Sequence, residues 1–240
     1  MTISIVIPFY NEEEAFQETL DPLLKELEVS KVTYELILVD NGSWDKTGYL
    51  IDQAMIKNPR LKKVCVDKNE GYGWGIINGL KSTTGNYVGF ICGDGQITAR
   101  DVVKTVQFAI KENYNLVKVQ RKKRKDGFLR VVVTRIYNWI VPYIFSLKTR
   151  DINGTPKIFS RELYEQLDLQ SKDWFIDAEI MIKSDILGVH FQELPVTFNA
   201  RKKGASHVSV LKAILEFVKN VYQFKTSRHY KSWKESKRLS

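Results

Sequence analysis

The chain has 240 residues, of which 43% are apolar and 27% charged, and its formal net charge is +9. This length fits one domain with a sizeable core, and the composition excludes a disordered or collagen-like chain. Two cysteines, Cys65 and Cys92, cannot build a disulfide framework, so we expect a reducing compartment. No apolar run of about 18 residues and no signal-peptide pattern occurs, so we expect neither a transmembrane helix nor a leader.

Positive charge is concentrated in two segments. Residues 201–240 hold eleven Lys and Arg against two Asp and Glu, and residues 121–125 read Arg-Lys-Lys-Arg-Lys. Such basic surfaces attract phosphates, anionic lipids or nucleic acids. For the C-terminal segment, a frayed tail that only keeps the chain soluble is an equal alternative.

The first half alternates short apolar runs with helical patterns. We expect strands over residues 3–7, 35–39, 61–66, 87–92 and 116–119, and helices over 12–28, 45–57, 71–82 and 100–111. Strands that alternate with helices of this length predict βαβ units, and therefore an α/β fold with a mostly parallel sheet.

The second half is less regular. An apolar segment over 128–147 contains Arg130, Arg135 and Pro142, and it predicts either a core helix or a helix in a membrane interface. Strand-like runs follow over 154–159 and 189–198, with helices over 176–187 and 208–224 and then a basic tail. We divide the chain into a domain over 1–206 and a C-terminal helix and tail over 207–240.

Polar residues and glycines follow each of the first four predicted strands. In open α/β sheets ligands bind beyond the carboxyl ends of the strands, and small or acidic residues there suit a nucleotide. These residues are Pro8, Tyr10, Asn11 and Glu12, then Asp40, then Asn69 and Gly71, and finally Gly93, Asp94, Gly95 and Gln96. We interpret the neighbouring Asn41, Ser43 and Asp45 as turn or cap residues.

Each kind of residue has a physical role at such a site. The Asp40 carboxylate can accept hydrogen bonds from a base or a ribose, while glycines let the backbone approach a ligand. The glycine run 71–75 lacks the spacing of a dinucleotide fingerprint and follows the third strand, which disfavours a dehydrogenase. Asp94 and Gln96 offer oxygen atoms of the kind that Mg²⁺ or Mn²⁺ takes beside a diphosphate.

Four segments together resemble a known family. They are Ile-Val-Ile-Pro-Phe-Tyr-Asn-Glu-Glu (5–13), Val-Asp-Asn-Gly-Ser-x-Asp-x-Thr (39–47), Asn-x-Gly-x-Gly (69–73) and Gly-Asp-Gly-Gln (93–96). In order and spacing they resemble family 2 glycosyltransferases with the Rossmann-like GT-A fold, above all the branch of dolichyl-phosphate mannose synthases and polyprenyl-phosphate sugar transferases. The resemblance implies a nucleotide-sugar donor, Mg²⁺ or Mn²⁺, inversion at the anomeric carbon, and a polyprenyl phosphate or lipid-linked glycan as acceptor.

The resemblance also implies roles for later residues. Arg121 is similar to a donor-side arginine after the fifth strand, and Asp151 to a residue on the acceptor side. Asp177 and Glu179 fall where such enzymes carry an acidic pair near the acceptor. Arg201 and Ser206 resemble a basic loop that closes over phosphates. The family's metal motif is normally Asp-x-Asp. In this chain Cys92 takes the place of its first aspartate, and this puts strict metal dependence in doubt.

The acceptor decides the mechanism. A lipid phosphate is already ionised and needs no general base, so cations are sufficient, and the candidates are Arg121, Arg130, Arg135 and Arg201. A sugar hydroxyl needs a base, for which Asp177 or Glu179 is the candidate.

We therefore predict an inverting glycosyltransferase that moves a sugar from a nucleotide-sugar donor to a polyprenyl-phosphate-type lipid at the cytoplasmic face of an anionic membrane. The predicted catalytic residues are Asp94, Asp177, Glu179 and Arg201. A membrane subunit is a possible partner, and no nucleic acid is expected. The alternatives are transfer to a glycan hydroxyl and a non-catalytic nucleotide-sugar-binding subunit.

Overall fold

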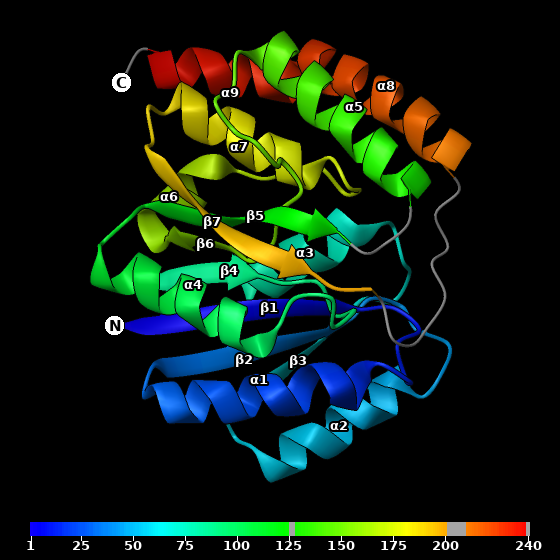
Figure 1. The fold of residues 1–240 in the computed structure, drawn as a ribbon, viewed down its shortest axis with the longest axis vertical. Coiled ribbons are helices and arrows are strands. Elements are labelled where there is room, and N and C mark those ends of the chain that lie inside the picture. Colours follow the sequence, from blue (N-terminus) through cyan, green and yellow to red (C-terminus); the bar gives the residue numbers. More distant parts are fainter. Residues whose placement is uncertain (125–127, 201–209, 239–240) are drawn as a thin grey trace.

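The computed structural model describes residues 1–124, 128–200 and 210–238, and Figure 1 shows its elements in chain order. The strands are β1 (Thr2–Phe9), β2 (Thr33–Asp40), β3 (Leu61–Cys65), β4 (Tyr87–Phe90), β5 (Leu116–Arg124), β6 (Lys157–Ser160) and β7 (Phe191–Phe198). They form a seven-stranded sheet in the order β3-β2-β1-β4-β6-β5-β7. β6 runs antiparallel to β4 and β5, and the other neighbours are parallel.

This topology brings the ends of separate strands together. Because β6 is antiparallel to both its neighbours, β5 points the same way as β4 and β1. The carboxyl ends of β1, β2, β3, β4 and β5 therefore meet at one edge, where the amino end of β6 also lies. The expected mostly parallel α/β sheet is confirmed.

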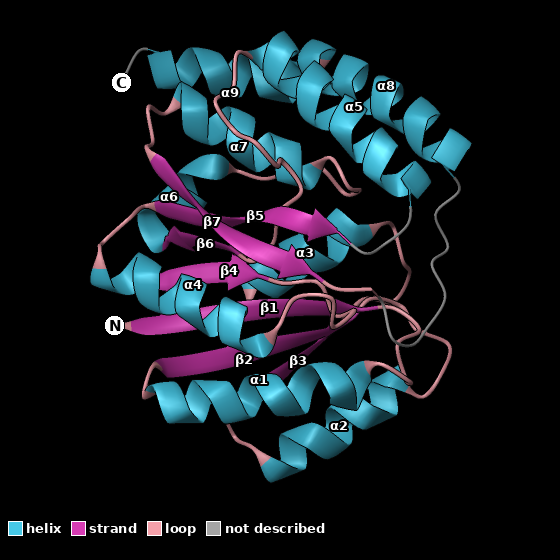
Figure 2. Ribbon diagram, in the orientation of Figure 1, coloured by secondary structure: helices cyan, strands magenta, loops and turns pink. Residues whose placement is uncertain are grey.

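Helices cover both faces of the sheet, as Figure 2 shows. They are α1 (Phe16–Ser30), α2 (Thr47–Lys57), α3 (Tyr72–Lys81), α4 (Ala99–Lys111), α5 (Phe128–Phe145), α6 (Arg161–Leu167), α7 (Ile176–Ile186), α8 (Val210–Thr226) and α9 (Arg228–Arg238). In β1, Ile5 packs into the core that includes α1 and α4, while Val6 packs into the core that includes α3 and α7. A strand buried on both faces reads as a continuous apolar run, which is the pattern of residues 3–7.

The C-terminal residues are more ordered than the sequence predicted. We expected a basic tail after residue 224, but residues 228–238 form α9, in which Tyr230 and Trp233 are buried. The Trp233 indole N–H donates to the Gln166 carbonyl (2.9 Å). The frayed-tail alternative is therefore wrong for α9. The predicted domain boundary at residues 206–207 lies outside the described residues.

Two further differences concern the second half of the chain. Helix α6 was not predicted. Strand β5 was expected to end at residue 119 but continues to Arg124, because β7 provides a parallel partner as far as the pair Arg124 and Phe198. The start of the basic segment 121–125 is therefore the end of a strand at the carboxyl edge of the sheet.

Helix α5 has one buried and one exposed face. Val141 is fully buried, whereas Trp139 is 71% and Tyr143 80% exposed. Among the helices of the described ranges, none is long and apolar enough to cross a membrane. One face of the helix therefore joins the core, as the core-helix alternative predicts, and the other exposes aromatic side chains. The membrane-interface alternative stays a prediction.

Candidate active site

The loops after β1 and β2 are joined by hydrogen bonds at the carboxyl edge. The Asn11 N–H donates to Ser43 Oγ (3.2 Å), and the Trp44 N–H donates to Asn11 Oδ1 (3.0 Å). The Glu12 N–H donates to Thr47 Oγ1 (2.9 Å). Both loops are thereby held in one arrangement beside the end of β2. Of the predicted donor-binding residues, Tyr10, Asn11 and Glu12 lie in the loop after β1, and Pro8 lies near the end of β1 itself.

Asp40 and Asn41 follow each other at the end of β2 but have different environments. Asp40 is partly exposed, and its Oδ1 accepts the Ser43 N–H (2.9 Å), which fixes the carboxylate at the strand end. Asn41 is only 3% exposed and donates from Nδ2 to the Gly71 carbonyl (3.0 Å). Asn41 therefore connects the β2 exit to the start of α3, as expected for a turn residue, while Asp40 remains available to a ligand.

Glycines at the start of α3 allow another loop to approach closely. Gly71 has a φ of +128°, and its N–H donates to Asn69 Oδ1 (2.8 Å). A Cβ at Gly71 or Gly73 would collide with backbone atoms of residues 171–173. Because no side chain is present, the segment before α7 packs directly against the β3 exit.

Cys92 occupies the position where the family pattern has an aspartate, and it lies in a neutral polar cluster. Its Sγ is 3.2 Å from Tyr72 Oη and 3.5 Å from Thr155 Oγ1. Burial raises the pKa of the thiol to about 12, and the charge of Asp94 acts in the same direction. The thiol is therefore protonated at neutral pH, and a protonated thiol does not suit Mg²⁺ or Mn²⁺, which prefer oxygen ligands.

Asp94 supplies the carboxylate of this loop, with Gly93 and Gly95 on either side. Its Oδ1 accepts the Gln96 N–H (3.1 Å). Gln96 is buried and donates from Nε2 to the Asn199 carbonyl (2.9 Å), so it connects the loop to the end of β7. Within the described residues, no three His, Cys, Asp or Glu side chains gather as a metal centre. A single carboxylate still fits a divalent ion that takes its other ligands from donor phosphates and water.

A buried ion pair lies at the end of β5. Arg121 donates from Nε and Nη2 to the two carboxylate oxygens of Asp151, each at 2.8 Å, and Asn138 Nδ2 donates to Oδ1 (3.3 Å). Burial alone would raise the pKa of Asp151, but the hydrogen bonds and charge of Arg121 outweigh it and hold the pKa well below its usual range. The pair fixes the loop at residue 151 to the end of β5.

The predicted acidic pair at the start of α7 is already engaged with other groups. Asp177 is 2% exposed and forms an ion pair with Lys157, the first residue of β6. Burial lowers the pKa of Lys157 to about 8, although Asp177 acts in the opposite direction. Glu179 has no exposed surface, pairs with Lys183 (2.7 Å) and accepts the N–H groups of Gln170 and Ser171.

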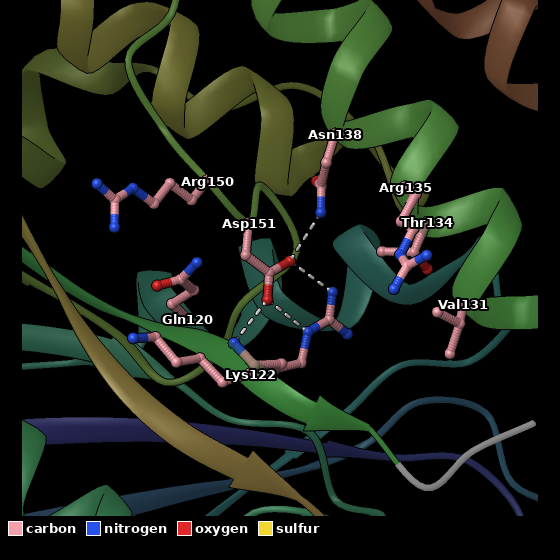
Figure 3. A pocket seen from close by; sticks show the side chains of 9 residues that line it. Gln120, Lys122, Val131, Thr134, Arg135, Asn138, Arg150 and Asp151 are labelled. Atoms are coloured by element: carbon pink, nitrogen blue, oxygen red, sulfur yellow. Dashed lines mark hydrogen bonds and ion pairs between the residues drawn. The ribbon is translucent and has the colours of Figure 1, made fainter.

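A cavity of about 340 Å³ opens between β5 and α5, and Figure 3 shows its lining. Asp151 lies between the two elements, with Lys122 on the β5 side and Arg135 on the α5 side. Lys122, Arg135 and Arg150 are exposed and line the cavity together with polar side chains. Its floor is the Arg121–Asp151 pair, so the cavity lies at the carboxyl edge and presents cations to it.

Some predicted residues fall outside this description. Arg201 and Ser206 lie outside the described residues, and for Arg130 only its position in α5 is described. Other residues of the site were missed by sequence reasoning. Lys118, fully buried in β5, pairs with Glu193 (2.8 Å). A lysine within the apolar run Leu-Val-Lys-Val was the signal that could have revealed a buried partner.

The comparisons with known proteins agree with this geometry. The sequence profile of glycosyl transferase family 2 matches residues 4–168. The undecaprenyl-phosphate 4-deoxy-4-formamido-L-arabinose transferase of Proteus mirabilis (strain HI4320) is 26% identical over 214 residues, which cover 88% of this chain. The match spans 64% of that relative, which is less than two thirds of its length.

Solved structures share the fold. The glucosyl-3-phosphoglycerate synthase of Mycobacterium tuberculosis, in complex with Mn²⁺, uridine diphosphate and phosphoglyceric acid, superposes with a TM-score of 0.68 at 21% identity, over 92% of this chain and 76% of that one. A mannosyltransferase of Pyrobaculum calidifontis, in complex with GDP-Man and Mn²⁺, gives a TM-score of 0.61 at 18% identity, over 97% and 69% of the two chains.

The chain belongs to glycosyl transferase family 2, since the family profile covers more than half of it. It has the GT-A fold of the glycosyltransferases that superpose on it. The family and the fold that the four sequence segments predicted are both confirmed.

The Arg121–Asp151 pair makes a stability prediction. Asp151→Asn leaves Arg121 buried beside a neutral amide, so the free energy of unfolding at pH 7 should fall by about 3 kcal/mol. Because the pKa of Asp151 is lower in the folded state than its ordinary 3.8, its contribution exists above about pH 4 and is lost as the pH falls. Between pH 7 and pH 3, the free energy of unfolding measured in urea should therefore fall more for the wild type than for the variant. Asp21→Asn, at an exposed site on α1, is the control, and an Asp151→Asn midpoint equal to the wild-type value would contradict the prediction.

Proposed function

We propose that this protein transfers a sugar, with inversion, from a nucleotide-sugar donor to a polyprenyl phosphate at the surface of a membrane. The main support for a phosphate acceptor is the cavity between β5 and α5, which is lined by cations and opens at the same edge as the proposed donor loops. The printed name of the Proteus mirabilis relative, an undecaprenyl-phosphate sugar transferase, supports the same acceptor class.

The donor site follows from the loops at the carboxyl edge. The connected loops after β1 and β2, with the Asp40 carboxylate, suit the nucleoside. The glycine-rich start of α3 and the loop around Asp94 suit the diphosphate, because backbone N–H groups and an oxygen ligand can reach it there. The solved relatives named above contain UDP and GDP-Man with Mn²⁺, which supports this class of donor.

The engaged state of the acidic pair favours the lipid phosphate over a sugar hydroxyl. A general base must reach the proton that it removes. Asp177 forms an ion pair with Lys157. Glu179 forms an ion pair with Lys183 and accepts two backbone N–H groups. An ionised phosphate needs no proton removed. We therefore assign Asp177 and Glu179 to positioning, and the glycan-hydroxyl alternative loses its base.

Cations then carry the acceptor side of the reaction. The nucleophilic phosphate oxygen and the donor diphosphate are both anionic, and their approach costs free energy unless positive charge lies between them. Lys122, Arg135 and Arg150 line the cavity where the acceptor phosphate would bind. Arg121 fixes the cavity floor through its ion pair with Asp151. Arg130, Arg201 and Ser206 stay predicted phosphate contacts.

A divalent ion would be held by Asp94 and by oxygens of the donor. When bound, it would supply positive charge that stabilises the departing nucleoside diphosphate. Cys92 contributes a neutral thiol at this place, so the chain itself provides one carboxylate where the family pattern has two. This favours weaker metal dependence, and it is also the observation behind a second candidate function, a non-catalytic nucleotide-sugar-binding subunit.

The proposed membrane contact is an aromatic face on two neighbouring helices. Helices α5 and α8 pack through Tyr137 and Phe217, whose ring centroids are 4.7 Å apart, and Figure 1 shows the helices side by side. Trp139 and Tyr143 on α5, and Tyr222 on α8, are each at least 70% exposed. Tryptophan and tyrosine favour the bilayer interface, and the basic C-terminal residues add attraction to anionic lipids. We place this contact at the cytoplasmic face.

The proposal is tested by release of nucleoside diphosphate. The purified protein is offered UDP-, GDP- and dTDP-sugars, with and without undecaprenyl phosphate, in Mn²⁺ and in EDTA. We expect release from one donor that rises at least tenfold with the lipid. Release that needs a glycan instead of the lipid would favour the hydroxyl acceptor. Nucleotide binding without release from any combination would identify the non-catalytic subunit.

Asp94→Ala should remove the metal-dependent part of donor binding, because the variant lacks the carboxylate that anchors the ion. Calorimetric titration with the nucleoside diphosphate should show that Mn²⁺ tightens binding to the wild type but changes the Kd of the variant less than twofold. Asp21→Ala, on the outer side of α1, is the matched control. Equal tightening by Mn²⁺ in Asp94→Ala and wild type would contradict the metal assignment.

The membrane face predicts the behaviour of a double variant. Trp139→Ala with Tyr143→Ala should weaken binding to vesicles of anionic phospholipid at least tenfold, because two aromatic side chains no longer leave water. Cosedimentation measures the binding, and Tyr49→Ala with Ile56→Ala, exposed apolar residues of α2, is the control. Unchanged binding would point to another surface, and wild-type binding that requires a membrane protein in the vesicles would indicate a subunit.

A further inference from the structure

An exposed tryptophan stands at the carboxyl edge and has no place in the function described so far. Trp174 precedes α7 and is 45% exposed. Its ring stacks on that of Tyr72, the first residue of α3, with centroids 4.4 Å apart and an interplanar angle of 18°. One face of the indole is thus covered by Tyr72. An indole whose other side remains accessible can pack against a ligand.

The loop that carries Trp174 is fixed from several sides. The Glu179 carboxylate accepts the N–H groups of Gln170 and Ser171. The Lys172 carbonyl accepts the Trp74 N–H (2.8 Å), and Asp173 Oδ1 accepts the N–H of Phe175 (2.8 Å), which is buried. An exposed aromatic ring on so constrained a loop loses little conformational entropy when it binds, which is the property of a preorganised contact.

The stack adjoins the place where the sugar end of the donor would lie. Tyr72 Oη is 3.2 Å from Cys92 Sγ, two residues before Asp94. Three residues after Trp174, Asp177 pairs with Lys157, which lies opposite Phe90 at the end of β4. In a nucleotide sugar the transferred sugar is bonded directly to the diphosphate. A diphosphate held at Asp94 therefore brings its sugar beside the Tyr72–Trp174 stack.

The stack rests on aromatic carbon. Tyr72, which covers one face of the indole, also makes an edge contact with the buried ring of Phe90, with centroids 6.5 Å apart. A neutral, aromatic surface suits the C–H groups on one face of a pyranose ring, since their apolar area leaves water on contact.

We propose that Trp174 binds the transferred sugar of the donor, with its accessible ring surface packed against the C–H face of a hexopyranose. The proposal rests on the nucleotide-sugar donor of the proposed function and names the residue that contacts the sugar. Glu179 acts through this residue as a positioning group, because it holds the loop on which Trp174 stands.

A comparison of two ligands tests the contact. From UDP-, GDP- and dTDP-hexoses, the one that the wild type binds is titrated calorimetrically, together with its nucleoside diphosphate, which lacks the sugar. Trp174→Ala should weaken binding of the nucleotide sugar about tenfold, the effect of removing a central aromatic contact. Its Kd for the nucleoside diphosphate should change less than twofold, which also shows that the variant is folded. Trp174→Phe should recover most of the sugar-dependent affinity, and Tyr49→Ala on α2 serves as the control.

Other outcomes would overturn the proposal. Equal weakening of both ligands would mean that Trp174 supports the nucleotide site as a whole. Unchanged affinity for both, with a raised KM for undecaprenyl phosphate, would assign the ring to the acceptor. If the wild type bound none of the UDP-, GDP- and dTDP-hexoses, the proposed donor class itself would fail, and that result is distinct because it appears before any substitution is made.

Discussion

Buried positive charge is the constraint on which the part of the structure from β5 to α7 depends. Lys118, Lys157 and Lys183 have no exposed surface, and an ion removed from water must be paired or it destabilises the fold. Each of these lysines contacts a carboxylate that lies far along the chain or on the next helical turn. These pairs connect β5 to β7, β6 to α7, and α7 to itself, so they fix the elements that surround the candidate site.

The same constraint gives several carboxylates a structural role. Asp151, Asp177 and Glu179 each resemble site residues in sequence, yet each compensates a buried cation or a set of backbone N–H groups. Asp40 is the last residue of β2, Asp94 lies in the loop after β4, and both are partly buried. In the proposed function, positive charge at the cavity and the oxygen atoms of Asp40 and Asp94 would carry the chemistry, which suits the meeting of two anions.

The sequence predicted the N-terminal half of the candidate site better than the C-terminal half, for a physical reason. In residues 1–111 each candidate residue lies at the end of a strand or in the loop that follows it, so apolar runs and glycines were enough to place Asp40, Gly71 and Asp94 at the carboxyl edge. The C-terminal half is built from long-range pairs, such as Lys118 with Glu193, and a single sequence carries no signal for the partner. Helix α9 was missed because most of its residues are charged or polar, so that Tyr230 and Trp233, the two that pack into the core, do not form a clear apolar pattern in the sequence.

The packing of α9 has a consequence for the rest of the molecule. Lys183 Nζ bonds to Glu179 and to the Asp168 carbonyl, and the ring of Trp233 covers it at 5.0 Å. The indole therefore excludes water from the Lys183–Glu179 pair, and the lower local dielectric constant strengthens the attraction between the two charges. A chain shortened before α9 would hydrate that pair and loosen the loop before α7. The last helix, although it lies far along the chain from the first donor loop, is in this way part of what shapes the carboxyl edge of the sheet.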